Sequence, residues 1–183
     1  MIMPWYNAKK ASQVAAFFCI KEGGKANVLK LTKLIYISDR THIEKYGYPI
    51  IDDEFVSMPH GPVNSLTLNF IQGNLESSDW SENITDKSNY AVALANPLSL
   101  DDLDELSRAE IDSLEKVWIK FGGLDQYQVR NWTHDNCPEW EDPSGSANPI
   151  PLQRIMKFVG IENSELYERR HKEMRQLATL NNS

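Results

Sequence analysis

The chain lacks the features that mark several large classes of protein. Its two cysteines, Cys19 and Cys137, lie far apart and in no paired motif, whereas disulfide scaffolds and zinc ribbons need more cysteines at closer spacing. No hydrophobic run approaches the roughly 20 residues that span a bilayer. The N-terminus also does not resemble a signal peptide. We therefore expect a reduced, cytoplasmic protein that does not enter a membrane.

An excess of positive charge is also missing. The formal net charge is −7, from 26 acidic and 19 basic residues. A protein that binds nucleic acid without sequence preference needs a basic face that displaces counterions from the phosphates. The charge therefore argues against a nucleic-acid partner and favours a protein partner. We interpret the one basic stretch, YERRHKEMRQ at 167–176, as a solvated helix face.

The sequence contains no glycine-rich phosphate loop, no nucleophile elbow and no zincin motif. One enzymatic alternative remains, a metal-assisted hydrolase that uses Asp39, His42, His60 and His134. These residues are dispersed along the chain, whereas zinc ligands are typically found at short spacings. We therefore predict that the protein is not an enzyme and holds no metal and no cofactor.

Apolar residues recur at helical spacing through most of the chain. The helices that this pattern predicts lie at 7–22, 27–46, 62–72, 100–121, 124–134 and 164–179. Only 50–58 and 90–95 favour extended strands, and we expect them to pair as one antiparallel hairpin. The predicted fold is thus mainly α with a small antiparallel β-hairpin, an α+β arrangement. We expect a compact single helical domain at 1–150 and a C-terminal helical extension at 151–183.

Two polar residues continue the apolar stripe of the helix predicted at 27–46. Asp39 and His42 follow Val28, Leu31 and Ile35 at steps of three or four residues, so all five share one face. A buried charge without a partner costs several kcal/mol. We therefore expect both polar side chains to find partners within the same chain.

The stretch His60-Gly61-Pro62 lies between the first predicted strand and the helix predicted at 62–72. Pro62 suits the first position of a helix, where the missing N–H would have no partner. Gly61 permits a backbone conformation that other residues resist. Turn chemistry does not explain the imidazole of His60, so we interpret this corner as a contact site. The alternative is that His60 only caps the helix.

Residues 31–63, LTKLIYISDRTHIEKYGYPIIDDEFVSMPHGPV, resemble the core signature of the Panacea family, the SocA-like antitoxin domains often found in phage-associated genes. That signature combines a Lys-Leu-x-Lys-Leu-x-Tyr helix, an aromatic-Gly-x-Pro turn, an acidic pair before a strand and a Gly-Pro-Val corner. The matching residues are Lys30, Leu31, Lys33, Leu34, Tyr36, Tyr46, Gly47, Pro49, Ile50, Asp53, Glu54, Phe55, Gly61, Pro62 and Val63. A second block of the family, a Thr-His pair followed by a tryptophan, resembles Thr133, His134 and Trp140.

The resemblance implies an antitoxin of a toxin–antitoxin system, which neutralises a cognate protein toxin by direct protein–protein binding. The residues that we predict to contact the toxin are Arg40, His60, Gly61, Pro62 and Trp140. The residues that we predict to hold the fold through polar contacts are Asp39, His42, Thr133 and His134. Two alternatives to the antitoxin remain, the metal-assisted hydrolase and a DNA-binding autoregulator. Whether the protein forms a homo-oligomer is left open.

Overall fold

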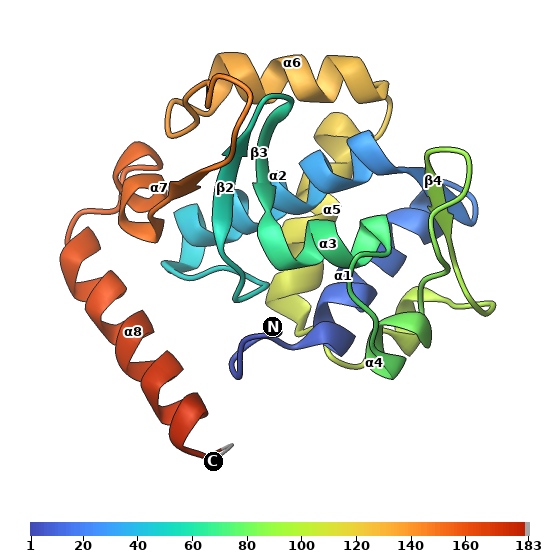
Figure 1. Cartoon of the computed structure of the whole chain (residues 1–183), viewed down its shortest axis with the longest axis horizontal. Helices are drawn as coiled ribbons and strands as arrows, with labels where there is room; N and C mark the ends of the chain where they lie inside the picture. Colours follow the sequence, from blue (N-terminus) through green and yellow to red (C-terminus); the bar gives the residue numbers. More distant parts are fainter. Residues whose placement is uncertain (182–183) are drawn as a thin grey trace.

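The computed structural model describes residues 1–181 and is mainly helical, with two small antiparallel sheets (Figure 1). The helices are α1 (Ala8–Lys21), α2 (Val28–Tyr46), α3 (Ser65–Gln72), α4 (Ser78–Ser81), η1 (Leu100–Asp102, a 3-10 helix), α5 (Arg108–Phe121), α6 (Gln126–Asn136), α7 (Leu152–Phe158) and α8 (Ser164–Asn181). The strands are β1 (Lys25–Asn27), β2 (Phe55–Met58), β3 (Gly61–Asn64), β4 (Ala91–Ala93) and β5 (Asn148–Ile150). The predicted fold class is confirmed. Among the helices of residues 1–181, none combines the length and the hydrophobicity that crossing a bilayer requires.

The strands pair differently from the predicted hairpin. β2 pairs with β3 on one side and with β5 on the other, whereas β4 pairs with β1. The predicted pairing of 50–58 with 90–95 is therefore wrong. β3 follows β2 after only two residues, Pro59 and His60, and a short loop closes at a lower entropic cost than a long one.

The start of α3 also differs from the prediction. The helix predicted at 62–72 begins at Ser65, and the residues before it form β3. Pro62 therefore lies in a strand opposite Ser57, not at the first position of a helix. β3 is an edge strand, because its sheet has the order β3-β2-β5. A proline is tolerated there since its missing N–H removes no hydrogen bond from a central ladder.

The helix ends follow from local capping chemistry. The side chains of Asn7 and Asn27 accept hydrogen bonds from the first turns of α1 and α2, at the positions where the predicted helices begin. Gly47 ends α2 in the left-handed conformation at φ 80°. The helix predicted at 100–121 is divided into η1 and α5, because Ser107 and Glu110 form a capping box that starts α5.

α2 lies at the centre of the molecule and packs against α1, α5, α6, α7 and β3. It contributes to both hydrophobic clusters of the described chain. Leu31, Leu34 and Ile35 belong to the larger cluster, which includes side chains of α1 and α5. Tyr36 and Ile43 belong to the smaller cluster, which includes side chains of β2, β5 and α7. Both clusters therefore fix the position of α2, and with it the side chains that α2 presents to the hairpin.

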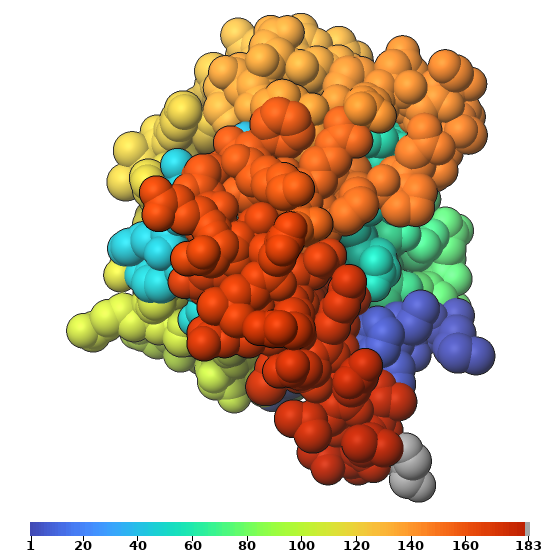
Figure 2. Space-filling view, turned by 90° about the vertical axis from the view of Figure 1, so that its left-hand side faces the viewer, coloured from blue at the N-terminus to red at the C-terminus, as the bar shows by residue number. Residues whose placement is uncertain are grey.

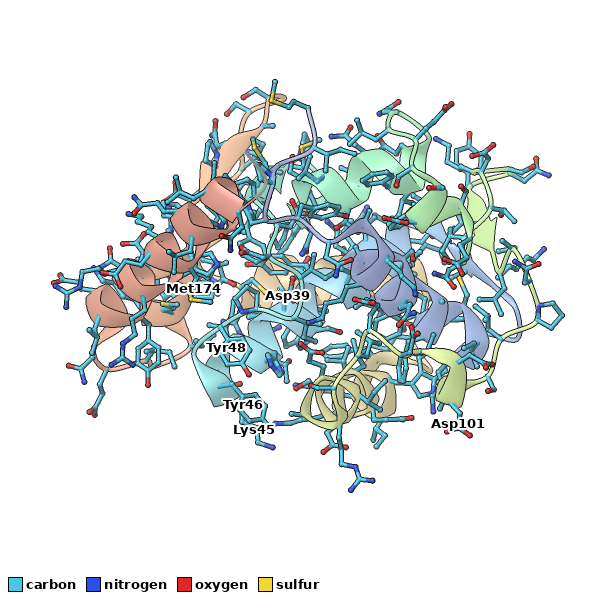
Figure 3. All side chains as sticks on the ribbon, turned by 90° about the horizontal axis from the view of Figure 1, so that it is seen from below. Asp39, Lys45, Tyr46, Tyr48, Asp101 and Met174 are labelled. Carbon is cyan, nitrogen blue, oxygen red and sulfur yellow. The ribbon has the colours of Figure 1, made fainter. Side chains whose placement is uncertain are left out.

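The C-terminal helices cover one face of the molecule (Figure 2). The guanidinium of Arg175 on α8 lies 2.6 Å from carboxylate oxygens of both Asp52 and Glu54, and His171 lies 2.8 Å from Asp52. The basic stretch at 167–176 is therefore not a purely solvated face, because two of its residues hold α8 against the segment before β2. On another side of the same helix, Met174 is exposed (Figure 3).

Candidate functional site

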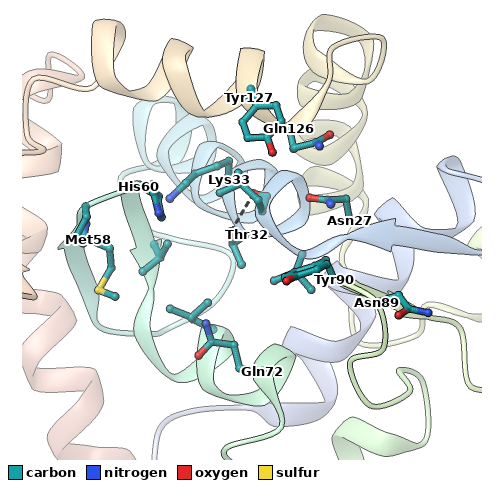
Figure 4. A pocket seen from close by; sticks show the side chains of 15 residues that line it. Asn27, Thr32, Lys33, Met58, His60, Gln72, Asn89, Tyr90, Gln126 and Tyr127 are labelled. Carbon is teal, nitrogen blue, oxygen red and sulfur yellow. Dashed lines mark hydrogen bonds between the residues drawn. The ribbon is translucent and has the colours of Figure 1, made fainter. Parts of the chain in front are cut away.

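A pocket of about 490 Å³ opens between α2, the β2–β3 hairpin, α3 and the start of α6 (Figure 4). Its size falls within the roughly 300–1,000 Å³ of small-ligand sites. Apolar side chains contribute much of its wall, including Val28, Leu29, Val63 and Leu68. The polar and aromatic side chains that face it include Lys33, His60, Tyr90 and Tyr127.

The hairpin corner forms one edge of this pocket. His60 is exposed at the tip, and Gly61 adopts a φ of +100°. A Cβ atom at position 61 would lie 2.8 Å from the Oγ1 atom of Thr133, closer than real contacts allow. The positive φ confirms the prediction that position 61 needs the backbone freedom of glycine. Close packing against Thr133 is a second reason for a glycine there.

His60 does not cap the following helix, so that alternative reading of the residue is wrong. The buried carboxylate of Asp53 performs the capping, because it accepts hydrogen bonds from the backbone N–H groups of Leu66 and Thr67, both at 2.9 Å. The imidazole of His60 remains at the pocket, where its contact role stays a prediction.

Lys33 points from the second turn of α2 toward the same corner (Figure 4). Its side chain is almost fully buried, with 1% of the residue exposed. The ammonium nitrogen donates a hydrogen bond to the carbonyl oxygen of Pro62 at 2.9 Å. Burial lowers the pKa of Lys33 to about 7, and the nearby Arg130 acts in the same direction. Near neutral pH both the charged and the neutral form of the amine are therefore populated.

The second family-like block lies directly behind the hairpin. The Trp140 indole N–H donates a hydrogen bond to the carbonyl oxygen of Met58 at 2.9 Å. The Trp140 ring stacks on His134, with centroids 4.2 Å apart, and Thr133 donates to the carbonyl oxygen of Arg130 at 2.6 Å. Thr133 thus makes the kind of polar contact that we predicted, whereas the contact of His134 is ring stacking and its polar role stays a prediction. These contacts also place Trp140 in support of the hairpin, and its contact with a toxin stays a prediction.

The predicted placement of Arg40 on the outer side of α2 is wrong. The Nε atom of Arg40 donates to Glu139 at 2.7 Å, and only 16% of the Arg40 side chain is exposed. Glu139 is fully buried, and the Tyr36 hydroxyl donates to the same carboxylate oxygen at 2.7 Å. Because Glu139 lies far along the chain, periodicity alone could not show that Arg40 turns inward to pair with it.

Asp39 and His42 find partners within the chain, as predicted. Asp39 lies deep in the molecule (Figure 3) and accepts hydrogen bonds from the backbone N–H groups of Ile50 and Ile51 and from the side chain of Asn64. Burial raises its pKa to about 7 even though these three donors act in the opposite direction. His42 lies 2.8 Å from the hydroxyl of Ser113 on α5, and burial lowers its pKa.

The structure does not assemble the metal site that was considered as an alternative. Asp39 binds the loop after α2, His42 packs on α5, and His134 stacks on Trp140. Within the 181 described residues, no group of three or more histidine, cysteine, aspartate or glutamate side chains could hold a metal ion.

Tyr90 is a pocket residue that sequence reasoning missed. The sequence places it in a strand, but β4 begins one residue later and Tyr90 occupies a turn with positive φ of 61°, next to Asn89 at 50°. Ser88 and Ala91 close this turn through two backbone hydrogen bonds. The left-handed conformation costs a residue other than glycine about 1–2 kcal/mol. This turn nevertheless holds an aromatic ring that is 81% exposed.

The model of the family described as "Antitoxin SocA-like, Panacea domain" matches residues 31–141, more than half of the chain. The matched segment contains Lys33, the hairpin, α6 and Trp140, so it includes most of the elements that frame the pocket. No curated protein and no solved structure matches the chain.

Proposed function

The chain belongs to the SocA-like antitoxin family with a Panacea domain, and we propose that it neutralises a cognate protein toxin by binding it directly at the pocket beside the β2–β3 hairpin. In this proposal the protein acts by binding and not by catalysis. The family match supports the antitoxin role. The pocket supports the position of the contact.

The observation that carries the proposal is the exposed aromatic ring of Tyr90 at the pocket. Backbone strain concentrates at functional sites, because a strained turn persists only where the surrounding structure or selection for function maintains it. Tyr90 and Tyr127 are 81% and 55% exposed. Tyrosine is enriched among the residues that dominate binding energy in protein interfaces. The two rings therefore suit the role of anchors for a toxin segment that enters the pocket.

The hairpin gives this surface a fixed shape before binding. Lys33 holds the carbonyl oxygen of Pro62 on β3, and Trp140 holds the carbonyl oxygen of Met58 on β2. A corner that is fixed on both strands loses little conformational entropy when a partner binds. This arrangement favours His60, which lies between the two contacts, as a further contact residue.

The test uses the toxin encoded in the neighbouring reading frame, expressed with and without this protein. Tyr90→Ala and Tyr127→Ala should each weaken toxin binding by about tenfold or more and reduce the rescue of growth. Both variants should unfold at nearly the parent temperature, because these side chains bury little area.

Ile119→Ala provides the matched control. Ile119 lies on α5, outside the pocket, and is 82% exposed. Its replacement should leave the affinity unchanged. The proposed binding face would be wrong if Ile119→Ala weakened binding as much as the pocket variants, or if both tyrosine variants bound the toxin normally.

A further inference from the structure

Among residues 1–181, no carboxylate lines the pocket beside the hairpin. Its lining includes Lys33 and His60, but no aspartate and no glutamate. The chain as a whole has 26 acidic residues and a net charge of −7. The pocket therefore differs in the sign of its charge from the protein that surrounds it.

Lys33 leaves most of its hydrogen-bonding capacity unused. An ammonium group has three N–H donors, and within residues 1–181 Lys33 uses one, toward the carbonyl oxygen of Pro62. It forms no ion pair with a carboxylate of the described chain. A buried charge that lacks a counterion is costly, so an anion that entered the pocket would relieve this cost.

Lys30, one turn earlier on α2, is a buried lysine whose charge is balanced by a carboxylate of the same chain. Only 8% of the residue is exposed. Its ammonium group forms an ion pair with Glu22 and donates to the carbonyl oxygen of Gly122 at 2.8 Å. The helix therefore buries two lysines. Lys30 has its counterion in the chain, whereas Lys33, which faces the pocket, has none among the residues that the structure describes.

Several titratable and charged groups surround Lys33, and the one that acts on it most directly has the same sign. Arg130 and His134 approach from α6, His60 lies on the hairpin, and the Cys137 thiol follows α6. Burial raises the pKa of Cys137 to about 12, so this thiol stays neutral at physiological pH. Burial also lowers the pKa of His134, and Asp135 beside it carries the opposite sign. Arg130 is therefore the charged group that acts on Lys33 directly, and it disfavours the ammonium form until an anion binds.

We propose that this pocket receives an acidic side chain of the toxin, whose carboxylate pairs with the ammonium group of Lys33. This inference rests on the proposed function and specifies the chemistry of the bound segment. Neighbouring apolar side chains of that segment would pack against Val63 and Leu68. A single compact ammonium group suits one carboxylate that comes with apolar neighbours, whereas phosphate sites typically use forked arginine contacts or several backbone N–H groups.

The first experiment tests the carboxylate preference without the toxin. The probes are 4-phenylbutyrate and its uncharged amide, which have nearly the same shape. In NMR titrations the carboxylate should shift the methyl signals of Val63 and Leu68 and raise the pKa of Lys33, and the amide should bind more weakly. Equal binding of the two probes would overturn the proposal.

Lys33→Met and Lys30→Met form a matched pair for the same titrations. Lys33→Met should abolish the preference for the carboxylate, whereas Lys30→Met should retain it. If Lys33→Met kept the preference, the proposal would be wrong. Lys33→Gln serves as a second variant, because it removes the charge but can still donate a hydrogen bond to Pro62. It should therefore lose the preference even if Lys33→Met disturbs the hairpin.

The second experiment measures toxin affinity for the same variants and for Tyr90→Ala. Lys33→Met and Lys33→Gln should weaken binding by at least about tenfold, as expected when one partner of a buried charge pair is removed. Lys30→Met should not. If Tyr90→Ala weakened binding and both Lys33 variants bound normally, the carboxylate proposal would be overturned and the binding face would stand. If all of these variants and Tyr127→Ala bound normally, both proposals would be overturned.

Discussion

The ammonium nitrogen of Lys33 lies 2.9 Å from the carbonyl oxygen of Pro62, and this contact connects the second turn of α2 to the edge strand β3. Trp140 makes the matching contact to Met58 on the neighbouring strand. The tip that contains His60 is thus held from two sides. The same lysine that fixes the hairpin also faces the pocket, so structure and proposed recognition depend on one side chain.

Lys33 should make the protein more stable as the pH rises above neutrality. Its pKa is about 7 in the folded protein and 10.5 in the ordinary reference state. Between these values the unfolded chain binds more protons than the folded one, so the free energy of unfolding increases with pH, by up to about 1.4 kcal/mol per pH unit. Below pH 7 both states are protonated, and the contribution of this group no longer changes.

The measurement is chemical denaturation of the parent and of Lys33→Met across this pH range. The difference between their free energies of unfolding should change with the predicted slope, in favour of the parent at higher pH. Subtracting the variant removes the contributions of the other titrating groups. A constant difference from pH 7 to 10.5 would contradict the account of Lys33 as an unpaired buried amine.

Tyr90→Gly should raise the stability of the protein and weaken its binding to the toxin. The substitution relieves about 1–2 kcal/mol of backbone strain at φ 61°, and the added freedom of the unfolded chain offsets roughly 0.5–1 kcal/mol of this gain. The variant should therefore be up to about 1 kcal/mol more stable by thermal denaturation, yet bind the toxin more weakly. A variant that is less stable than the parent would show that the ring of Tyr90 supports the fold.

Gly61→Ala should destabilise the protein more than the matched change Gly145→Ala. Both glycines have positive φ, at 100° and 92°. Only at Gly61 does an added Cβ meet a neighbour, the Thr133 Oγ1 atom at 2.8 Å, whereas nothing lies within 4 Å at Gly145. Gly145→Ala should thus cost about 1 kcal/mol of strain, and Gly61→Ala about 1–3 kcal/mol more. Equal losses in denaturation would argue against the close packing of the corner on α6.

Arg40→Ala should unfold the protein at markedly lower denaturant concentration. It leaves the buried carboxylate of Glu139 without its charged partner, and breaking a buried pair in this way costs about 3–5 kcal/mol. Arg154→Ala is the control, because its pair with Glu141 lies on the surface and such pairs contribute at most about 1 kcal/mol. If Arg40→Ala kept the parent stability but lost toxin binding, Arg40 would belong to the binding face after all.

The sequence predicted those parts of the fold that depend on neighbours in the chain. The helix predicted at 27–46 agrees with α2, which Asn27 and Gly47 cap, because a cap is a contact within one helical turn. Pairings between distant segments could not be predicted in the same way. β5 pairs with β2, and Arg40 pairs with the buried Glu139. Neither contact produces a pattern among neighbouring residues from which it could be predicted.

The candidate site was predicted in part for the same reason. His60 and Gly61 stood out because turn chemistry is local, and the structure places both at the pocket or its edge. Pro62 was misplaced because proline suits an edge strand as well as a helix start. Tyr90 carried no signal, since a tyrosine next to an alternating segment favours a strand by pattern alone.

The most direct test of the proposed binding face is photocrosslinking from the position of Tyr90. A benzoylphenylalanine residue at this position replaces one exposed aromatic side chain with another, and the same residue at Ile119 serves as the control. Irradiation of the complex with the toxin should crosslink the two proteins efficiently from position 90 and not from position 119. Crosslinking from position 119 without crosslinking from position 90 would contradict the proposal that the toxin binds at the pocket beside the hairpin.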